Sequence, residues 1–418
     1  MNCRHCQAPL HHVFLDLGFA PPSNAYLSDA DLRRPETSFP LKLFVCDHCW
    51  LVQTEDYVAS DELFRADYAY FSSTSATWLQ HARDYSGMIR QRLGLTPESF
   101  VIEVAANDGY LLKNFIEAGI PCVGIEPTEA TAIAAESQGI PIIRSFFSEQ
   151  LARTMLSGSS GDQGGQTPML SQADLIVGNN VFAHVPDIND FTRALKLALK
   201  PGGTITLEFP HLLNLICEGQ FDTVYHEHFS YLSLTAVQRI FGRHGLRILE
   251  VEQLPTHGGS LRVYGAHADD LRPADDSVTR TLRQELSAGL LDLATYGRFQ
   301  ARADSIKNDL LLYLIECKRA GRRIVGYGAA AKGNTLLNYA GVRPDLLPYV
   351  CDAAPAKQGK YLPGSHIPIR PPQTLRDDPP DEILILPWNL AGELRGQLGD
   401  LVDIGVRLVT AIPRIRVI

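Results

Sequence analysis

The sequence predicts an α/β protein in which a doubly wound, Rossmann-like sheet lies between a small N-terminal cysteine-containing domain and a second, C-terminal α/β domain. Three observations predict this architecture: two C-x-x-C pairs before residue 50, a strand, turn and helix pattern at residues 101–112, and a similar pattern at residues 323–335. Between and after them, strand and helix patterns alternate, which is typical of parallel sheets covered by helices.

The size and composition of the chain indicate more than one folded domain. The 418 residues, 45% hydrophobic and 20% charged, exceed one typical domain, so we expect domains at residues 1–72, 73–275 and 276–418. The net charge of −9 argues against a nucleic-acid partner, because nucleic-acid-binding proteins carry a basic face. No apolar run reaches membrane-spanning length and no signal-peptide core is visible, so we expect no membrane partner and a cytoplasmic location.

The N-terminal domain carries four cysteines with the spacing of a metal site. Cys3 and Cys6 form one C-x-x-C pair, Cys46 and Cys49 form the other, and 39 residues lie between the pairs. Two such turns can present four thiolates to one tetrahedral ion, so we expect a structural Zn²⁺ held by these four ligands. A redox C-x-x-C is the alternative, but neither pair is expected to follow a strand and open a helix.

The central domain shows the strand and helix order of a doubly wound sheet. The expected elements are helix 76–93, strand 101–105, helix 110–118, strand 122–126, helix 128–138, strands 140–143 and 174–178, a helix to Lys200, strand 204–209, and a closing antiparallel pair at 246–252 and 260–266. Pro-Gly-Gly before strand 204–209 is common in class I methyltransferases. The C-terminal domain is expected to have a helical stretch over 278–320 and strands near 347–351, 382–386 and 406–411.

The turn after strand 101–105 predicts a nucleoside site. Glu103 lies on the strand, and Asn107, Asp108 and Gly109 form the turn. Glycine lets the backbone approach a ligand, and Glu126 at the tip of the next strand can accept hydrogen bonds from ribose hydroxyls.

Two further residues are expected to line this site: Pro127, next to the second acid, and Asn179, after the fourth strand. A dinucleotide site would show a fuller G-x-G-x-x-G turn, which binds pyrophosphate through backbone amides. The single glycine and the acid on the first strand suit a cationic ligand, S-adenosylmethionine, better than an anionic pyrophosphate.

The ionisable run Tyr-His-Glu-His at residues 225–228 is a candidate catalytic segment. At helical spacing, Tyr225 and His228 share a face while Glu227 points elsewhere. Two interpretations stay open: a helix start satisfied by local contacts, or a general base with a phenol partner that removes a proton next to a carbonyl. His184 and His211 follow the next two strands, at the edge where such sheets bind ligands, and we expect His211 to line the pocket.

The glycine-rich turn at residues 326–334, Gly-Tyr-Gly-Ala-Ala-Ala-Lys-Gly-Asn, is a second candidate binding loop. It is not a Walker A motif, because the order Gly-Lys-Ser/Thr is absent. Its amides and Lys332 could bind a diphosphate, and Tyr327 and Asn334 complete the expected substrate-binding set. A tight packing turn is the alternative.

Together these motifs resemble those of a known family, the three-domain, zinc-containing, S-adenosylmethionine-dependent sugar C-methyltransferases of deoxysugar biosynthesis, of the tetronitrose C-3 methyltransferase type. The resemblance covers essentially the whole chain. It rests on the two C-x-x-C pairs, the E-x-x-x-N-D-G turn, the Y-H-E-H segment and the late G-Y-G-A-x-x-K-G-N-T turn.

The resemblance implies a nucleotide-sugar substrate, a nucleoside-diphosphate 4-keto-deoxysugar that is methylated at C-3. His228 looks like the base that takes the C-3 proton, Tyr225 and Glu227 like its supporting residues, and His184 like the histidine after the fourth strand. Tyr70, in Y-x-Y-F-S-S, looks like a tyrosine that the family brings into the sugar pocket from the N-terminal side. The C-terminal domain is expected to close over the nucleotide end.

Other functions stay open on sequence alone. A small-molecule O- or N-methyltransferase could use the same sheet without an enolising base. A non-catalytic, zinc-anchored nucleotide-binding protein would leave the Tyr-His-Glu-His run unexplained. An oxidoreductase with a nucleotide cofactor at residues 326–334 ranks lowest, because no set of residues for hydride transfer is visible.

Overall fold

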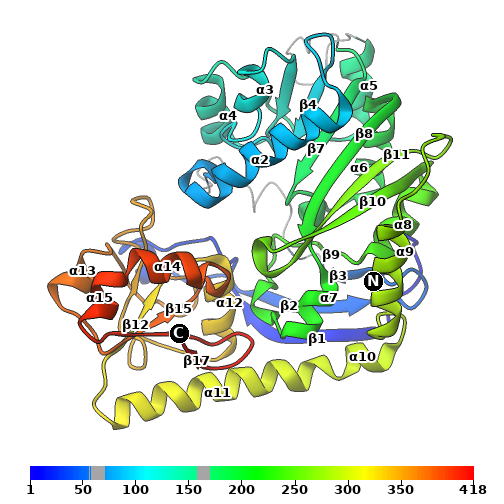
Figure 1. Cartoon of the computed structure of the whole chain (residues 1–418). Coiled ribbons are helices and arrows are strands. Elements are labelled where there is room, and N and C mark those ends of the chain that lie inside the picture. Colours follow the sequence, from blue (N-terminus) through cyan, green and yellow to red (C-terminus); the bar gives the residue numbers. More distant parts are fainter. Residues whose placement is uncertain (56, 58–70, 158–169) are drawn as a thin grey trace.

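A computed structural model describes residues 1–55, 57, 71–157 and 170–418 of the protein, which is built on three β-sheets (Figure 1). The N-terminal sheet is antiparallel and has the order β1-β2-β3-β9. Its strands are β1 (His12–Ala20), β2 (Phe39–Val45), β3 (Val52–Thr54) and β9 (Ser230–Tyr231). Because β9 comes from the middle of the chain, the central part of the protein completes the N-terminal sheet.

The central sheet has the order β10-β11-β8-β7-β4-β5-β6, and only β11 runs antiparallel to its neighbours. Its strands are β4 (Val101–Val104), β5 (Cys122–Ile125), β6 (Ile142–Ile143), β7 (Ala173–Asn179), β8 (Leu199–Pro210), β10 (Leu246–Leu254) and β11 (Ser260–His267). The accompanying helices are α2 (Ala76–Leu93), α3 (Lys113–Ile116), α4 (Glu129–Glu136), α5 (Glu149–Ser157), α6 (Ile188–Ala198), α7 (Leu212–Glu218) and α8 (Leu234–Arg243). This arrangement confirms the predicted class I methyltransferase sheet.

The expected helix at residues 76–93 is confirmed by α2, which has a clear signal at each end. The Ser75 side chain accepts a hydrogen bond from the Trp78 amide at the start, and Gly94, in the left-handed region with φ 60°, ends the helix.

The C-terminal part carries a parallel sheet in the order β14-β13-β12-β15-β16, to which β17 adds an antiparallel edge. Its strands are β12 (Ile324–Tyr327), β13 (Val350–Cys351), β14 (Ile369–Arg370), β15 (Glu382–Ile385), β16 (Arg407–Thr410) and β17 (Arg416–Val417). Its helices are α12 (Ala331–Tyr339), α13 (Thr374–Asp377), α14 (Ala391–Gln397) and α15 (Gly399–Asp403). It is therefore the second α/β unit that the sequence predicts.

One long helix joins the N-terminal and C-terminal sheets. Figure 1 shows α11 (Phe299–Arg319) running below both. Phe14 of β1, Phe299 and Leu310 of α11, and Leu337 of α12 belong to one buried core. A shared core of this kind fixes the positions of the two sheets relative to each other.

Three local predictions were wrong. The stretch 278–320 is not one helix but three, namely α9 (Asp276–Ser287), α10 (Leu293–Gly297) and α11, because Gly289 and Asp292 end one helix and cap the next. The helix expected from Tyr110 is only the single turn α3, and turns precede it. Residues 225–228 lie in a turn after a short 3₁₀ helix and not in an α-helix.

The four predicted zinc ligands lie together beside the N-terminal sheet. The sulfur atoms of Cys3, Cys6, Cys46 and Cys49 are all within 4.8 Å of one another, and among the described residues they form the group suited to a metal ion. Four thiolates at this separation fit tetrahedral Zn²⁺, since the ion needs no further ligand. Among all the described residues, no helix has the length and apolar character needed to span a membrane.

We expect the purified protein to contain about one zinc ion per chain, measurable by plasma mass spectrometry. Cys46→Ser should release the zinc and lower the melting temperature, because loss of one thiolate opens the site. Cys217→Ser is the matched control, since Cys217 is an exposed cysteine outside the cluster. A folded, active protein without zinc would contradict the assignment.

Candidate active site

The predicted cofactor turn follows β4 and has a backbone shape that few residues adopt. Gly109 has a φ of 80°, and a Cβ there would lie 2.1 Å from Cδ1 of Ile140, so no side chain fits. Ala105 and Asn107 also have positive φ, of 59° and 50°. Strained backbone in non-glycine residues tends to occur at functional sites.

Hydrogen bonds from both sides hold this turn. The carboxylate of Glu126, at the tip of β5, accepts the Asn107 amide at 2.9 Å. The side chains of Asn107 and Asp108 accept the amides of Ser72 and Ser73 at 2.9 and 3.0 Å. Tyr70, predicted to enter the sugar pocket, lies outside the described residues. The segment just after it thus contacts the cofactor turn directly.

The side chains around the turn fit a cationic ligand. Glu103 is fully buried, and burial, with the nearby Asp108 and Glu126, raises its pKa well above the usual range. Within the described residues, Oδ1 of Asp108 and the amide group of Asn179 are buried without a hydrogen-bond partner. A positive charge among these carboxyl groups would reverse the pKa shift. The residues predicted to bind S-adenosylmethionine therefore suit its charge and polar groups, and Pro127 continues the chain at the same edge.

The predicted catalytic residues Tyr225, His228 and His184 lie together, and we call these three the histidine cluster. The ring centroids of Tyr225 and His228 are 4.0 Å apart, and those of His184 and His228 are 4.6 Å apart. His184 ends the short helix η3 (Phe182–His184) after β7, while the other two follow η4 (Phe221–Thr223). The predicted contact is correct, although a turn and not a helix produces it.

Backbone carbonyls fix the tautomer of both histidines. Nδ1 of His228 lies 3.1 Å from the carbonyl oxygen of Thr223, and Nδ1 of His184 lies 2.8 Å from that of Glu227. Because a carbonyl can only accept, each Nδ1 carries the hydrogen and each Nε2 carries a lone pair. Burial lowers the pKa of His184 to about 4, and burial with the nearby His184 lowers that of His228 well below its usual value. Both rings are therefore neutral at pH 7.

Glu227 connects this site to the N-terminal domain. Its Oε1 accepts a hydrogen bond of 3.1 Å from Nδ2 of Asn24, which lies between β1 and β2. Its Oε2 is buried without a partner among the described residues, and burial raises the pKa of the carboxyl group. The hydrogen bond to Asn24 thus connects the residue next to His228 to the N-terminal domain.

The C-terminal domain reaches the same site through Lys332 and Trp388. Nζ of Lys332 donates to Oδ1 of Asn389 at 2.7 Å and lies 4.8 Å from the Trp388 ring centroid. The indole N–H of Trp388 donates to Oδ2 of Asp222 at 2.7 Å. Burial lowers the pKa of Lys332 and raises that of Asp222 to about 6. Asp222 lies in η4, so this contact joins the C-terminal domain to the turn that carries Tyr225 and His228.

Three of the predicted substrate-binding residues pack or hydrogen-bond against other parts of the protein. Tyr327 packs in the core of the C-terminal domain. Nδ2 of Asn334 donates to the Ser23 carbonyl at 2.6 Å, and Nε2 of His211 lies 2.7 Å from Oε1 of Glu285 with both side chains buried. Their role in substrate binding stays a prediction.

A buried polar group that the sequence did not predict lies on β8. Glu208 on β8 is buried and lies 2.9 Å from Nε2 of His81 and 2.8 Å from Nη2 of Arg262. Burial alone would raise the pKa of Glu208, but His81 and Arg262 lower it to about 2. Glu208 could have been predicted as a functional residue from the sequence, because it is a charged residue within an otherwise apolar strand. His81 has no such signal, because only the fold brings α2 to β8.

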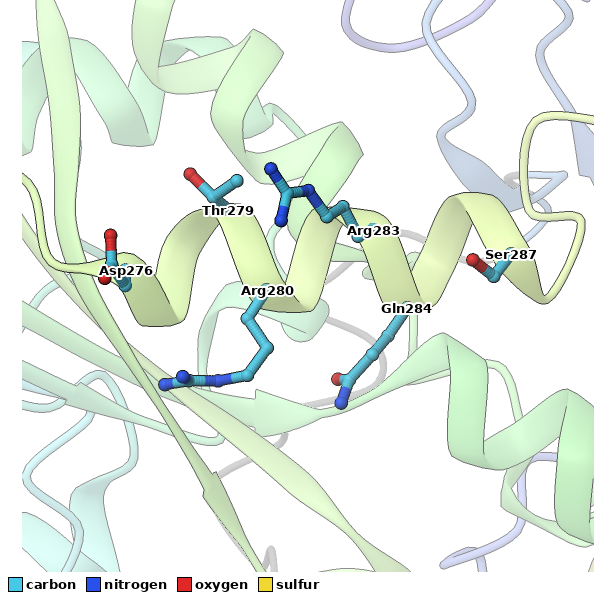
Figure 2. Close-up of a pocket in the computed structure, with 6 residues that line it drawn as sticks. All are labelled: Asp276, Thr279, Arg280, Arg283, Gln284 and Ser287. Carbon is cyan, nitrogen blue, oxygen red and sulfur yellow. The ribbon is translucent and has the colours of Figure 1, made fainter.

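A shallow depression on the surface of α9 is separate from this site. Figure 2 shows its lining side chains, which all come from this helix: Asp276, Thr279, Arg280, Arg283, Gln284 and Ser287. The other face of α9, with Val278, Thr281 and Glu285, is buried. The depression shares no residue with the cofactor turn or the histidine cluster.

Family models match three successive parts of the chain. Residues 3–64 match a family described as "Putative zinc binding domain", residues 78–251 a "Methyltransferase domain", and residues 255–413 a "C-methyltransferase C-terminal domain". The matched order is the order of the three sheets.

The chain is also similar to one characterised relative over its whole length, and more weakly to several solved structures. The chain is 33% identical to the C-methyltransferase NovU of Streptomyces niveus, and the match covers 100% of this chain and 96% of NovU. The magnesium protoporphyrin IX methyltransferase ChlM of Synechocystis PCC 6803 with bound SAM is 12% identical, with a TM-score of 0.36 over 51% of this chain and 100% of that one. The glycopeptide N-methyltransferase MtfA is 13% identical, with a TM-score of 0.32 over 44% of this chain and 90% of that one. The match to NovU and the three family models show that the chain belongs to the zinc-containing, S-adenosylmethionine-dependent C-methyltransferases.

Proposed function

We propose that this C-methyltransferase acts on C-3 of a nucleoside-diphosphate 4-keto-deoxysugar, and that His228 removes the C-3 proton. The observation that carries the proposal is the tautomer of His228. Its Nδ1 is bound to the Thr223 carbonyl, and its Nε2 has no partner among the described residues. A neutral imidazole with a lone pair available at Nε2 is suited to act as a general base.

A carbon-bound proton next to a ketone is weakly acidic, and a base removes it only when the resulting enolate is stabilised. His228 would take this proton at Nε2 and become an imidazolium. The Tyr225 ring, with its centroid 4.0 Å away, would stabilise the new charge through its π-system. Nδ1 would keep its hydrogen bond to Thr223, so the ring need not move during the transfer.

The other residues position the two substrates. Glu103, Asp108, Glu126 and Asn179 would hold S-adenosylmethionine, which supplies an electrophilic methyl group when bound. Lys332 brings a positive charge from the C-terminal domain to the turn that carries His228. This charge supports the proposal that the C-terminal domain binds the diphosphate-bearing end of the sugar nucleotide. Holding acceptor carbon and methyl donor in line is the main contribution expected from such a site.

The direct test is incubation with S-adenosylmethionine and a thymidine-diphosphate 4-keto-2,6-dideoxysugar. We expect a product heavier by one methyl group, with NMR placing that methyl on C-3. A methyl on oxygen or nitrogen, or no product from a protein that binds the cofactor, would refute the proposal.

The control for this assay is His228→Asn. The asparagine amide can still donate to the Thr223 carbonyl, so the variant keeps the structural bond and loses the Nε2 lone pair. We expect turnover to fall by about 10²–10⁴-fold, with S-adenosylmethionine affinity measured by calorimetry unchanged. Near-normal turnover would remove His228 from the base role.

The neutral buried histidines predict a loss of stability in acid. The pKa of His184 is lowered from an ordinary 6.5 to about 4, so the unfolded chain takes up the proton first as the pH falls. The free energy of unfolding should therefore drop from pH 7.5 to 5, by about 2 kcal/mol for His184 alone. Urea denaturation at both pH values measures the change. His184→Asn should show a correspondingly smaller drop, and equal drops in both proteins would contradict the assignment.

A further inference from the structure

Two strained residues from separate loops lie side by side at the edge of the central sheet. His257, in the hairpin η5 (Thr256–Gly258) between β10 and β11, has a φ of 55°, and Asn180, just after β7, has a φ of 53°. Both residues lie where β8 ends. Asn179, next to Asn180, pairs with Glu208, and Ser260, after the hairpin, pairs with Pro210, the last residue of β8. Left-handed backbone in non-glycine residues costs energy and points to a functional constraint.

A hydrogen bond joins the two side chains and sets the tautomer of His257. Nδ2 of Asn180 donates to Nε2 of His257 at 3.0 Å. The acceptor nitrogen carries the lone pair, so the hydrogen is on Nδ1. Within the described residues, this Nδ1–H has no hydrogen-bond acceptor. His257 therefore presents an unused donor.

The hairpin that carries His257 is held from several directions. Oγ1 of Thr256 donates to Glu208 at 2.8 Å, and Nε2 of Gln220 donates to the Gly258 carbonyl at 2.8 Å. A Cβ at Gly258 would lie 2.4 Å from the Trp388 ring, so the C-terminal domain touches the hairpin directly. The His257 ring also meets Trp78 edge-on, with centroids 5.2 Å apart. A donor fixed in this way is preorganised, which is what catalysis by hydrogen bonding needs.

His257 lies near residues that contact the cofactor turn and near the histidine cluster. Its hydrogen-bond partner Asn180 follows Asn179, whose side-chain amide is among the expected cofactor contacts. The ring centroid of Trp78, which His257 contacts, lies 6.0 Å from that of Tyr110, the residue after the cofactor turn. Burial, with the nearby charge of Lys332 and a smaller effect of His184, lowers the pKa of His257 to about 4. His257 in turn contributes to the lowered pKa of His228. A neutral imidazole thus lies near both the histidine cluster and Asn180, the residue after the expected cofactor contact Asn179.

We propose that His257 is a catalytic residue whose Nδ1–H donates a hydrogen bond to the ketone oxygen that becomes the enolate oxygen, with Asn180 as its positioning residue. This inference rests on the proposed function. No proton moves from His257: the donor stabilises the negative charge that forms on oxygen when His228 removes the C-3 proton. A neutral imidazole is a suitable donor here, since its hydrogen bond strengthens as that charge develops.

Two substitutions separate this role from a structural one. In His257→Asn the amide nitrogen can replace Nδ1–H as donor, and asparagine tolerates the left-handed backbone. In His257→Gln the amide oxygen can replace Nε2 as acceptor for Asn180, but the donor at Nδ1 is lost. A catalytic donor predicts greater activity in the asparagine variant, whereas a structural link to Asn180 predicts the reverse.

The readout is solvent deuterium exchange at C-3 of the same 4-keto sugar nucleotide, measured together with methyl transfer. We expect His257→Gln to lower both rates by about 100-fold and His257→Asn to lower them less, with cofactor affinity unchanged in both. His366→Gln and His366→Asn are the matched controls, because His366 also has a positive φ, of 56°, but bonds Glu36 on another surface. Both should behave as wild type.

The outcomes distinguish this inference from the proposed function. If the wild-type protein neither incorporates solvent deuterium at C-3 nor methylates the sugar, the proposed function is refuted, and the role of His257 is refuted with it. Normal exchange and methylation in wild type together with undiminished rates in His257→Gln refute the role of His257 alone. Higher activity in His257→Gln than in His257→Asn also overturns it, in favour of a structural link.

Discussion

The hydrogen bond between Nδ1 of His228 and the Thr223 carbonyl is the interaction on which the active site depends. It is 3.1 Å long and leaves Nε2 as the basic atom. The carbonyl belongs to η4, and the C-terminal domain fixes this turn: Trp388 bonds Asp222, and Thr335 bonds the Val224 carbonyl at 2.7 Å. The base that we propose is thus oriented by backbone that contacts with the C-terminal domain hold in place.

The zinc site stabilises the segment after His228 through the N-terminal sheet. The second cysteine pair lies between β2 and β3, and β3 pairs with β9 through Gln53 and Ser230, two residues beyond His228. The Thr54 amide also donates to the Phe229 carbonyl at 3.1 Å. A closed four-thiolate site has no open position for a substrate, so its contribution is structural. By stabilising the N-terminal sheet, the zinc site also stabilises β9, the strand that follows His228.

Features that depend on local spacing could be predicted from the sequence, and features that depend on the fold could not. The four cysteines, the turn at Gly109 and the helix between Ser75 and Gly94 follow short-range rules, and the structure places them as expected. The contact of Tyr225 with His228 was predicted for the wrong reason, because a turn brings the rings together. His257 and Asn180 meet only because β7 and the β10–β11 hairpin end at one edge of the sheet. No sequence pattern encodes that meeting.

Nitrogen-15 NMR of the histidine side chains can show whether His228 is a neutral ring whose Nδ1 carries the hydrogen, as the proposed base must be. Comparison of wild type with His228→Asn assigns the His228 ring. We predict a neutral Nδ1–H form at pH 7, because burial lowers the pKa of His228 well below its ordinary value. A ring that titrates near its ordinary pKa, or carries its hydrogen on Nε2, would contradict the account.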